Sequence, residues 1–568
     1  MRTGQARRGV PEMAGDVMAT GTDTFDYVIV GAGSAGCVLA NRLTEDGRST
    51  VCLVEAGPPD NHPFIHIPGG YIRMVKNPRY TWQFKTEPSE GTAGRAISTT
   101  QGRTLGGSSS VNGLNYTRGV QLDYDLWAQR GNRGWSYADL LPYFRRTETR
   151  ISRTNPDPTY RGDSGPVRVT DCDWRHPACD AFIAGCREIG MPSDTDYNGA
   201  SQAHAGYSQR KIDGNRRMSA AHVYLGPAKG RANLKILTGA HVSRILFEGR
   251  RATGIDILRG RGGAAETIRA RREVIVSAGT ANTAKLLQIS GIGPGRLLGD
   301  LGVPVVRELP VGENLQDHYA IRAVARARDG IETINDCQSG PKLWREIARY
   351  LLRRPSILAI SPTVVSGFWK SDESLEEPDL QILFAPASYR KSETGVLDDF
   401  PGLTAGFYQE RPESVGYVRA RSTDPFADPA IQPNYLSAER DRQVAVGGVR
   451  LIRRIFDTPA MRAFIDHETA PGPARQSDEE LLDFARTDGS TAYHLIGSCR
   501  MGPAGRADSV VDDSLRVIGV DALRIVDASI MPTMPSGNTG AATFMLAEKG
   551  ADLIRGIAPP PAAELRAA

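Results

Sequence analysis

The sequence has few cysteines, no long apolar run and almost no excess charge of either sign. Its seven cysteines are an odd number among 568 residues, and no two of them form a Cys-x-x-Cys pair. That spacing argues against a disulfide framework and against a structural zinc site, so no metal is expected and a reducing cytoplasm is the default location. No run of about 18 apolar residues occurs, so no segment is expected to span a bilayer.

The charge balance excludes a strongly basic or acidic binding surface. Lysine and arginine number 69 against 65 acidic residues, which leaves a net charge of +4 and indicates no nucleic-acid partner. Apolar residues make up 40% and charged residues 24%, values typical of a globular protein whose length allows several domains. Residues 1–23 are polar and lack the apolar middle of a signal peptide, so we expect a disordered leader.

A glycine-rich turn directly follows a short apolar strand at the front of the chain. The turn contains Gly31, Gly33, Ser34 and Gly36, a helical apolar pattern follows it, and the next apolar strand ends at Glu55. Strand, glycine turn, helix, strand and acid form the βαβ dinucleotide-binding pattern. The first glycine permits the tight turn, the second lets a pyrophosphate approach the backbone, and the third packs helix on strand. Glu55 can accept the ribose hydroxyls and would repel a 2′-phosphate, but the pattern does not choose between NAD and FAD.

A second glycine-rich loop carries adjacent glycines and three consecutive serines. It runs from Gly102 through Gly106, Gly107 and Ser108 to Asn112. Its open backbone N–H groups and hydroxyl donors suit contact with a phosphate or with the edge of a flavin. On its own the loop could equally be flexible and without a ligand, but a complete βαβ unit precedes it.

The end of the chain holds a strand, a Pro/Gly-rich loop and a helix. The strand ends in Asp527, Asn538 and Thr539 stand at N-cap positions, and residues 541–553 have helical apolar spacing. The loop therefore aims a helix N-terminus at a target, for which an anionic ligand group is the natural candidate. His494 lies upstream in an apolar segment, where a single histidine is more often a core residue than a catalytic one.

Taken together, these blocks resemble the glucose–methanol–choline (GMC) family of FAD-dependent oxidoreductases, and most of all its bacterial choline dehydrogenase-type alcohol dehydrogenases. The resemblance runs from about Asp23 to the end of the last helix. One departure is Ala284, where the family usually has Pro or Ser, and the rest of that block is intact. The resemblance implies an α/β fold, α+β overall: a Rossmann-like FAD-binding domain with an interleaved substrate domain of antiparallel sheet and helices.

Both domains are expected to be built from separated chain segments. The FAD-binding domain is predicted from residues 24–149, 233–325 and 480–568, the last of which carries the active-site positions. The substrate domain is predicted from residues 326–479, and residues 150–232 are expected to be mixed or to belong to it.

The resemblance also assigns roles to individual residues. His494 matches the active-site base of the family, and Asn538 matches its second active-site position. Some members attach FAD through a histidine in the serine-rich loop, but Val111 stands there in this chain, so non-covalent FAD is expected. His318 is interpreted as structural. The expected FAD contacts are Gly31, Gly33, Ser34, Gly36, Glu55, Gly106, Gly107, Ser108, Asn112, Val242, Asp527 and Thr539.

The sequence thus predicts oxidation of an alcohol, of which a primary alcohol is the favoured class, to an aldehyde. His494 would take the proton, and the flavin would take the hydride. Two alternatives stay open: an FAD-containing lyase similar to hydroxynitrile lyases, and an oxygen-using oxidase in place of a dehydrogenase. An NAD enzyme is disfavoured by the serine-rich loop. The alcohol, the electron acceptor (oxygen, quinone or another) and the oligomeric state are not readable, and no aromatic cage for choline can be located.

Overall fold

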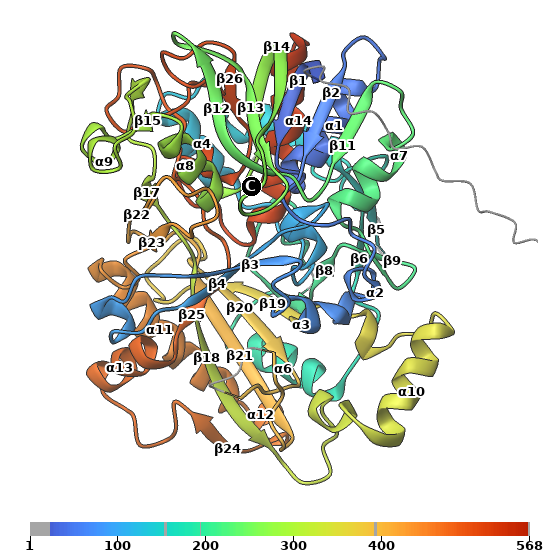
Figure 1. Ribbon diagram of the computed structural model, residues 1–568. Coiled ribbons are helices and arrows are strands. Elements are labelled where there is room, and N and C mark those ends of the chain that lie inside the picture. Colours follow the sequence, from blue (N-terminus) through green and yellow to red (C-terminus); the bar gives the residue numbers. More distant parts are fainter. Residues whose placement is uncertain (1–22, 153–155, 194, 391–394, 566–568) are drawn as a thin grey trace, which may run out of the picture.

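Two large sheets dominate the computed structural model, which describes residues 23–152, 156–193, 195–390 and 395–565 (Figure 1). Apart from Asp23, the expected leader lies outside the described residues. All seven cysteines are buried and unpaired. Within the described ranges, no helix has the length and apolar character needed to cross a membrane.

The first sheet contains the predicted βαβ unit. Its strand order is β11-β2-β1-β14-β13-β12, and β26 also pairs with β14. The strands β11, β2, β1, β14 and β26 run parallel, whereas β13 and β12 form an antiparallel extension. Their bounds are β1 Asp23–Val30, β2 Val51–Val54, β11 Leu234–Leu237, β12 His241–Glu248, β13 Arg251–Leu258, β14 Glu266–Val276 and β26 Leu523–Ile525. The sheet unites sequence-distant segments, as an interleaved domain requires.

Helices α1 (Ser34–Thr44) and α14 (Thr539–Arg555) pack together beside this sheet, and α5 (Tyr137–Thr147) packs on α14 (Figure 1). The predicted helix at 541–553 is therefore real and slightly longer than its apolar spacing suggested. Both α1 and α8 (Thr280–Ile289) begin directly after a parallel strand and a glycine turn. Ligands of open parallel sheets bind in the crevice at this carboxyl edge.

The second sheet is entirely antiparallel and has the order β24-β18-β21-β20-β19-β7, with β25 beside β18. Its bounds are β7 His204–Tyr207, β18 Tyr319–Ala327, β19 Val365–Trp369, β20 Leu380–Ala385, β21 Gly402–Gln409, β24 Ile465–Ala470 and β25 Ser490–Thr491. One face packs on helices through an apolar cluster that includes Ile321, Phe407 and Phe384. The α/β sheet and the interleaved antiparallel sheet confirm the predicted fold class.

The helices that cover that face are α6 (Pro177–Glu188), α11 (Glu439–Phe456), α12 (Pro459–Arg462) and α13 (Asp478–Asp488) (Figure 1). A further helix, α10 (Gly340–Leu351), stands at the edge of the molecule. The remaining shorter elements are α2 Pro63–His66, α3 Tyr71–Met74, β3 Thr81–Lys85, β4 Ser98–Gly102, α4 Gln121–Gln129, β5 Glu148–Ile151, β6 Val167–Asp171, β8 Gln209–Arg210, β9 Ile212–Asp213, β10 Arg216–Arg217, α7 Gly226–Ala228, β15 Ile292–Gly293, α9 Gly295–Asp300, β16 Arg307–Glu308, β17 Glu313–Leu315, β22 Gly416–Arg419 and β23 Ala430–Gln432.

The glycines of the first turn serve different purposes. A Cβ on Gly31, whose φ is +99°, would lie 2.4 Å from the Ser277 carbonyl oxygen, and one on Gly36 would lie 1.9 Å from the Gly31 carbonyl oxygen. These two are required by the fold itself. A Cβ on Gly33 would meet only the Ser277 oxygen, at 3.9 Å. Gly33 is therefore bare toward the crevice, as a backbone approached by a pyrophosphate has to be.

We predict that Gly33→Val loses the FAD that the resemblance implies. The fold leaves room for a Cβ at Gly33, but the larger valine side chain would fill the space through which the pyrophosphate approaches. It would also crowd Gly107, which packs so closely that a Cβ built on it would lie 2.6 Å from the Gly33 Cα. The measurement is the flavin-to-protein absorbance ratio of the purified variant. Gly505→Val, at an exposed turn without a positive φ where an added Cβ would have nothing within 4 Å, is the control for general instability. A fully flavinated Gly33→Val would contradict the cofactor assignment.

Candidate active site

A chain of hydrogen bonds links His494 to four other residues from separate parts of the sequence. The His494 Nε2 lies 3.1 Å from the Asn538 Nδ2, and its Nδ1 lies 2.9 Å from the His318 Nδ1. The His318 Nε2 lies 2.8 Å from the carbonyl oxygen of Glu410, at the end of β21. At the other end, the Thr117 hydroxyl donates to the Asn538 Oδ1 over 3.3 Å. The two predicted catalytic residues are thus brought together.

The chain fixes the tautomer of His494. A carbonyl oxygen can only accept, so the Nε2 of His318 must carry a proton. In neutral His318 the Nδ1 is then an acceptor, so the proton between the two rings belongs to the Nδ1 of His494. The Nε2 of His494 is left without a proton and accepts from the Asn538 amide. The Thr117 hydroxyl supports that orientation of the amide, because it needs an oxygen to donate to.

Both rings are held neutral. Burial lowers the pKa of His318 to about 4, and the Glu410 carbonyl only partly offsets it. Burial, followed by the neighbouring His318, lowers the pKa of His494 well below its usual value. His494 is nevertheless partly exposed, and Tyr493 beside it is exposed. A neutral, reachable imidazole with a bare Nε2 can take a proton from a hydroxyl group.

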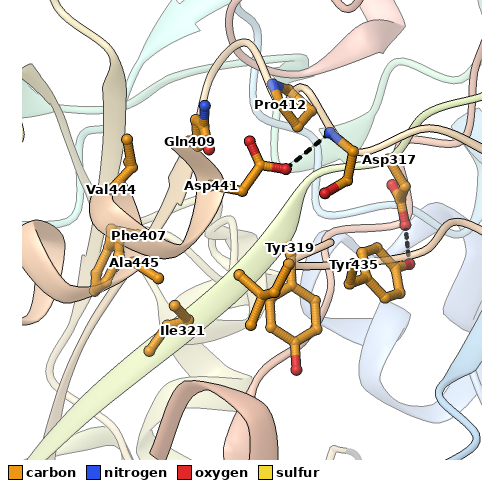
Figure 2. A pocket seen from close by; sticks show the side chains of 12 residues that line it. Asp317, Tyr319, Ile321, Phe407, Gln409, Pro412, Tyr435, Asp441, Val444 and Ala445 are labelled. Atoms are coloured by element: carbon orange, nitrogen blue, oxygen red, sulfur yellow. Dashed lines mark hydrogen bonds between the residues drawn. The ribbon is translucent and has the colours of Figure 1, made fainter. Parts of the chain in front are cut away.

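Asp317 holds the backbone of the segment that carries His494. Its carboxylate accepts from the His494 backbone N–H over 2.7 Å, and from the hydroxyls of Thr491 and Tyr435 over 2.5 Å each. Figure 2 shows Asp317 and Tyr435 in the wall of a small cavity of about 20 Å³, room for one water molecule. A cavity of this size cannot hold an alcohol of several carbon atoms, so we do not assign the substrate to it.

The face of the second sheet opposite its helices carries polar side chains next to the histidines. The ring of Tyr408 stacks on His318 at 4.5 Å and lies edge-on to His494 at 5.7 Å between centroids. Its hydroxyl donates to the Gln381 Oε1, whereas the buried Nε2 of Gln381 has no hydrogen-bond partner among the described residues. A Cβ on Gly537 would lie 3.3 Å from that Gln381 oxygen, which places Gln381 beside the Asn538 loop.

The two predicted glycine loops lie against each other at the carboxyl edge of the first sheet. The Gly106 N–H donates to the Ala32 carbonyl over 2.7 Å. Gly33 and Gly279 both present bare backbone, since a Cβ on Gly279 would have nothing within 4 Å. The residues present therefore fit a dinucleotide such as FAD, with the pyrophosphate at Gly33 and the N-terminus of α1, where Ser34 stands.

Two acids that were expected to contact FAD, Glu55 and Asp527, make hydrogen bonds within the protein. The carboxylate of Glu55 accepts the N–H groups of Ala32 and Gly57 over 3.0 and 2.8 Å, and burial raises its pKa to about 7. Asp527 accepts from the Gly279 N–H and the Thr283 hydroxyl with one oxygen. These bonds give both acids a role in shaping the crevice, and direct contact with FAD stays a prediction for each.

The remaining expected contacts differ in how available they are. The Ser108 hydroxyl donates to Gln101 and accepts from the Gly102 N–H. Asn112 accepts from Arg217 and from the Leu114 N–H with its oxygen, which leaves its amide N–H groups for a ligand. Val242 is a partly buried residue of β12. Their roles toward FAD stay predictions.

Asn538 is the N-cap residue of α14, as predicted, whereas Thr539, which was also expected at an N-cap position, is the first residue of the helix. The Asn538 side chain makes no capping hydrogen bond, because it is turned to His494 and Thr117. The first-turn N–H groups therefore keep their capacity for a ligand. Lys211 is buried, its ammonium lies 3.2 Å from a Cβ built on Gly540, and burial lowers its pKa to about 8. Helix terminus and lysine together favour an anionic or electron-rich group.

Sequence reasoning missed several residues of this site. His318 was interpreted as structural although it touches His494, and neither Asp317 nor Glu410 was singled out. For His318 and Asp317, the one sequence signal of a role in the site was their position in the family-like block Gly312–His318, which ends where β18 begins. Glu410 had no signal, because it contributes a backbone carbonyl that the register of the sheet positions.

Known proteins resemble this chain over nearly its whole length. Two GMC oxidoreductase family models match, at residues 25–320 and 412–547. Human mitochondrial choline dehydrogenase is 40% identical, with 94% of this chain and 90% of that protein covered. An alcohol dehydrogenase [acceptor] of Pseudomonas putida is 37% identical, with 93% and 95% covered. Among solved structures, pyridoxine 4-oxidase from Mesorbium loti has a TM-score of 0.84 and 30% identity, covering 94% of this chain and 99% of that one.

The family models span both halves of the molecule and include Thr117, His318, His494 and Asn538 of the hydrogen-bond chain. The two family models together cover most of the sequence, and the relatives match it along almost their full length. The chain belongs to the GMC oxidoreductase family.

Proposed function

We propose that the protein oxidises a primary alcohol to the aldehyde, with His494 as the base and Asn538 as the hydrogen-bond donor to the substrate oxygen. The observation that carries this proposal is the bare Nε2 of His494, which the chain through His318 to the Glu410 carbonyl enforces. Bound FAD supplies the hydride acceptor. Among relatives, the named activities are dehydrogenases and oxidases, so the lyase alternative is not favoured.

The protein's own groups perform the proton part of the reaction. As the hydroxyl proton moves to the Nε2 of His494, the oxygen becomes negative and needs a donor. The substrate hydroxyl displaces the Asn538 N–H from the single lone pair of the Nε2, and the amide, which Thr117 orients through its oxygen, then donates to the substrate oxygen. Because the Nδ1 proton of His494 already lies against His318, the ring cannot turn without losing that bond. The base is therefore preorganised.

His494→Ala is expected to retain FAD and to slow flavin reduction by an alcohol about 10²-fold or more, because the proton acceptor is gone. Anaerobic stopped-flow bleaching of the flavin band measures the rate. His467→Ala, which removes an exposed histidine paired with Asp466, is the matched control and should reduce at the wild-type rate. Unchanged reduction in His494→Ala would remove this residue from the mechanism.

FAD is proposed to bind without a covalent link, because Val111 has no nucleophilic atom. Val111 is nearly buried and packs with Ile65, Met74 and Tyr80 at the end of the serine-rich loop. Acid precipitation of the holoenzyme should therefore leave the flavin in the supernatant, where its absorbance is measured. Flavin that remains on the precipitated polypeptide would contradict this prediction.

We further infer that the alcohol is not a cation such as choline. Arg322 on β18 is paired with Gly406 on β21, two residues from the pair Ala320 and Tyr408, so Arg322 and Tyr408 lie on the same face. The guanidinium is exposed, and no hydrogen bond or ion pair joins it to any residue that the structure describes. Its positive charge partly offsets the raised pKa of four tyrosines around it, Tyr71, Tyr319, Tyr389 and Tyr493.

The nearby carboxyl group offers no counter-charge. Glu410 is buried, and neither of its carboxylate oxygens has a hydrogen-bond partner among the described residues. Burial, together with Asp123 and Asp379, raises its pKa well above the usual value in spite of Arg411. One oxygen of Glu410 also lies 4.0 Å from the Arg411 guanidinium, so this buried carboxyl offers no free counter-charge, and the free guanidinium of Arg322 repels a quaternary ammonium group.

Choline should therefore reduce the flavin less well than its uncharged isostere 3,3-dimethylbutan-1-ol. Two like charges about 10 Å apart at partly buried positions repel by roughly 1–2 kcal/mol, or about tenfold in apparent affinity. Arg322→Gln should shift the ratio of the two substrates toward choline by that factor, whereas Arg250→Gln, at a remote exposed site, should not. Preference of the wild type for choline would overturn this inference and leave the alcohol chemistry intact.

A further inference from the structure

Helix α10 presents apolar side chains to solvent. Trp344 is 70% exposed, Leu351 is 73% exposed and Leu352 is 68% exposed. With the exposed Ala348 they follow the spacing i, i+4, i+7, i+8, so Trp344, Ala348 and Leu351 form one face of the helix and the C-cap residue Leu352 extends it. We call these four residues the outer face. Scattered exposed apolar residues are normal, but a helical stripe that includes a tryptophan and two leucines indicates a partner.

The helix is held firmly by its other side, so the outer face is not an accident of a loose segment. Glu346 is buried and accepts the Ile357 N–H, and its carbonyl accepts from the Ser356 hydroxyl over 2.8 Å. The Asn215 amide donates to the Tyr350 carbonyl over 3.2 Å. Figure 1 shows α10 standing out from the body, away from both sheets. The fold therefore fixes the outer face where a flat surface can reach it.

The outer face is bordered by positive charge. Residues 340–356 contain five basic residues and one acidic residue. Glu332 pairs with Lys342 and Arg345, but the guanidinium groups of Arg353 and Arg354 form no ion pair with any described residue. An apolar stripe of Trp and Leu beside free arginines is the composition of a helix that lies in a membrane interface. A second copy of this chain fits poorly, because its outer face would carry the same charge.

We propose that the outer face of α10, with Arg353 and Arg354, docks the protein onto a membrane surface that contains anionic lipids. The apolar side chains would enter the boundary between headgroups and acyl chains, and the two arginines would contact lipid phosphates. The segment after α10 reaches the serine-rich loop: the Ser361 hydroxyl donates to the Gly113 carbonyl over 2.6 Å. The chain after α10 thus connects the proposed docking helix to the end of the loop that is proposed to contact FAD.

The test is co-sedimentation of the full-length holoenzyme with vesicles. Phosphatidylcholine vesicles with added phosphatidylglycerol should bind the protein, pure phosphatidylcholine vesicles should bind it much less, and high salt should weaken the first interaction. The triple variant Trp344→Ser, Leu351→Ser, Leu352→Ser should lower the partition coefficient at least about tenfold. Arg353→Gln with Arg354→Gln should lower it by about tenfold or more on anionic vesicles alone.

The matched control substitutes three exposed apolar residues elsewhere, Leu122, Val305 and Ile557, by serine. It should bind vesicles like the wild type. All variants should keep their flavin content and their rate of flavin reduction, because the outer face lies outside the catalytic site. Failure of the wild type to bind anionic vesicles would overturn the proposal, and so would equal loss in the control. A wild-type dimer that the triple variant converts to monomer would overturn it in favour of an interface between copies.

Discussion

The carbonyl oxygen of Glu410 determines the protonation of the groups around the proposed site. A carbonyl only accepts, so His318 must donate to it, and the proton between the two histidines must then belong to His494. The Nε2 of His494 is left as a lone pair that faces Asn538. A fixed backbone dipole thus performs what a carboxylate performs in other histidine sites. Because no charge is introduced, both rings stay neutral, and burial reinforces that state.

That arrangement depends on the joining of two sheets. Glu410 follows β21 and His318 precedes β18, strands paired in antiparallel register, so the carbonyl and the ring meet at one end of the second sheet. Asn538 comes from the loop before α14, which packs beside the first sheet. The base and its donor are therefore correctly spaced only when both sheets are formed and docked. A shift of either strand by one residue would turn His318 away from His494.

Local patterns were enough to predict the first half of this structure. In the first turn, Gly31 and Gly36 stand where the backbone leaves no room for a side chain, and Gly33 between them completes the motif. Asn538 before an apolar helical pattern indicated the start of α14. The contacts made by the second, antiparallel sheet could not be predicted from local patterns. His318 looked structural because its partner lies 176 positions away. Arg322 and Tyr408 share a face only through the strand register, which a single sequence does not specify.

Buried Asp317, which holds the His494 segment, lowers the stability of the fold. Burial raises its pKa to about 6, although Thr491, Tyr435 and the backbone N–H groups of His494 and His318 all lower it. A carboxyl whose folded pKa exceeds its unfolded value destabilises the fold as the pH rises through the unfolded value toward the folded one, since the unfolded chain ionises first. An uncharged residue in this place would remove that penalty, but it could not accept from three donors at once. The segment that carries His494 is therefore positioned at the expense of folding stability. Such a loss of stability is expected where a buried charge is kept for a functional site and does not strengthen the core.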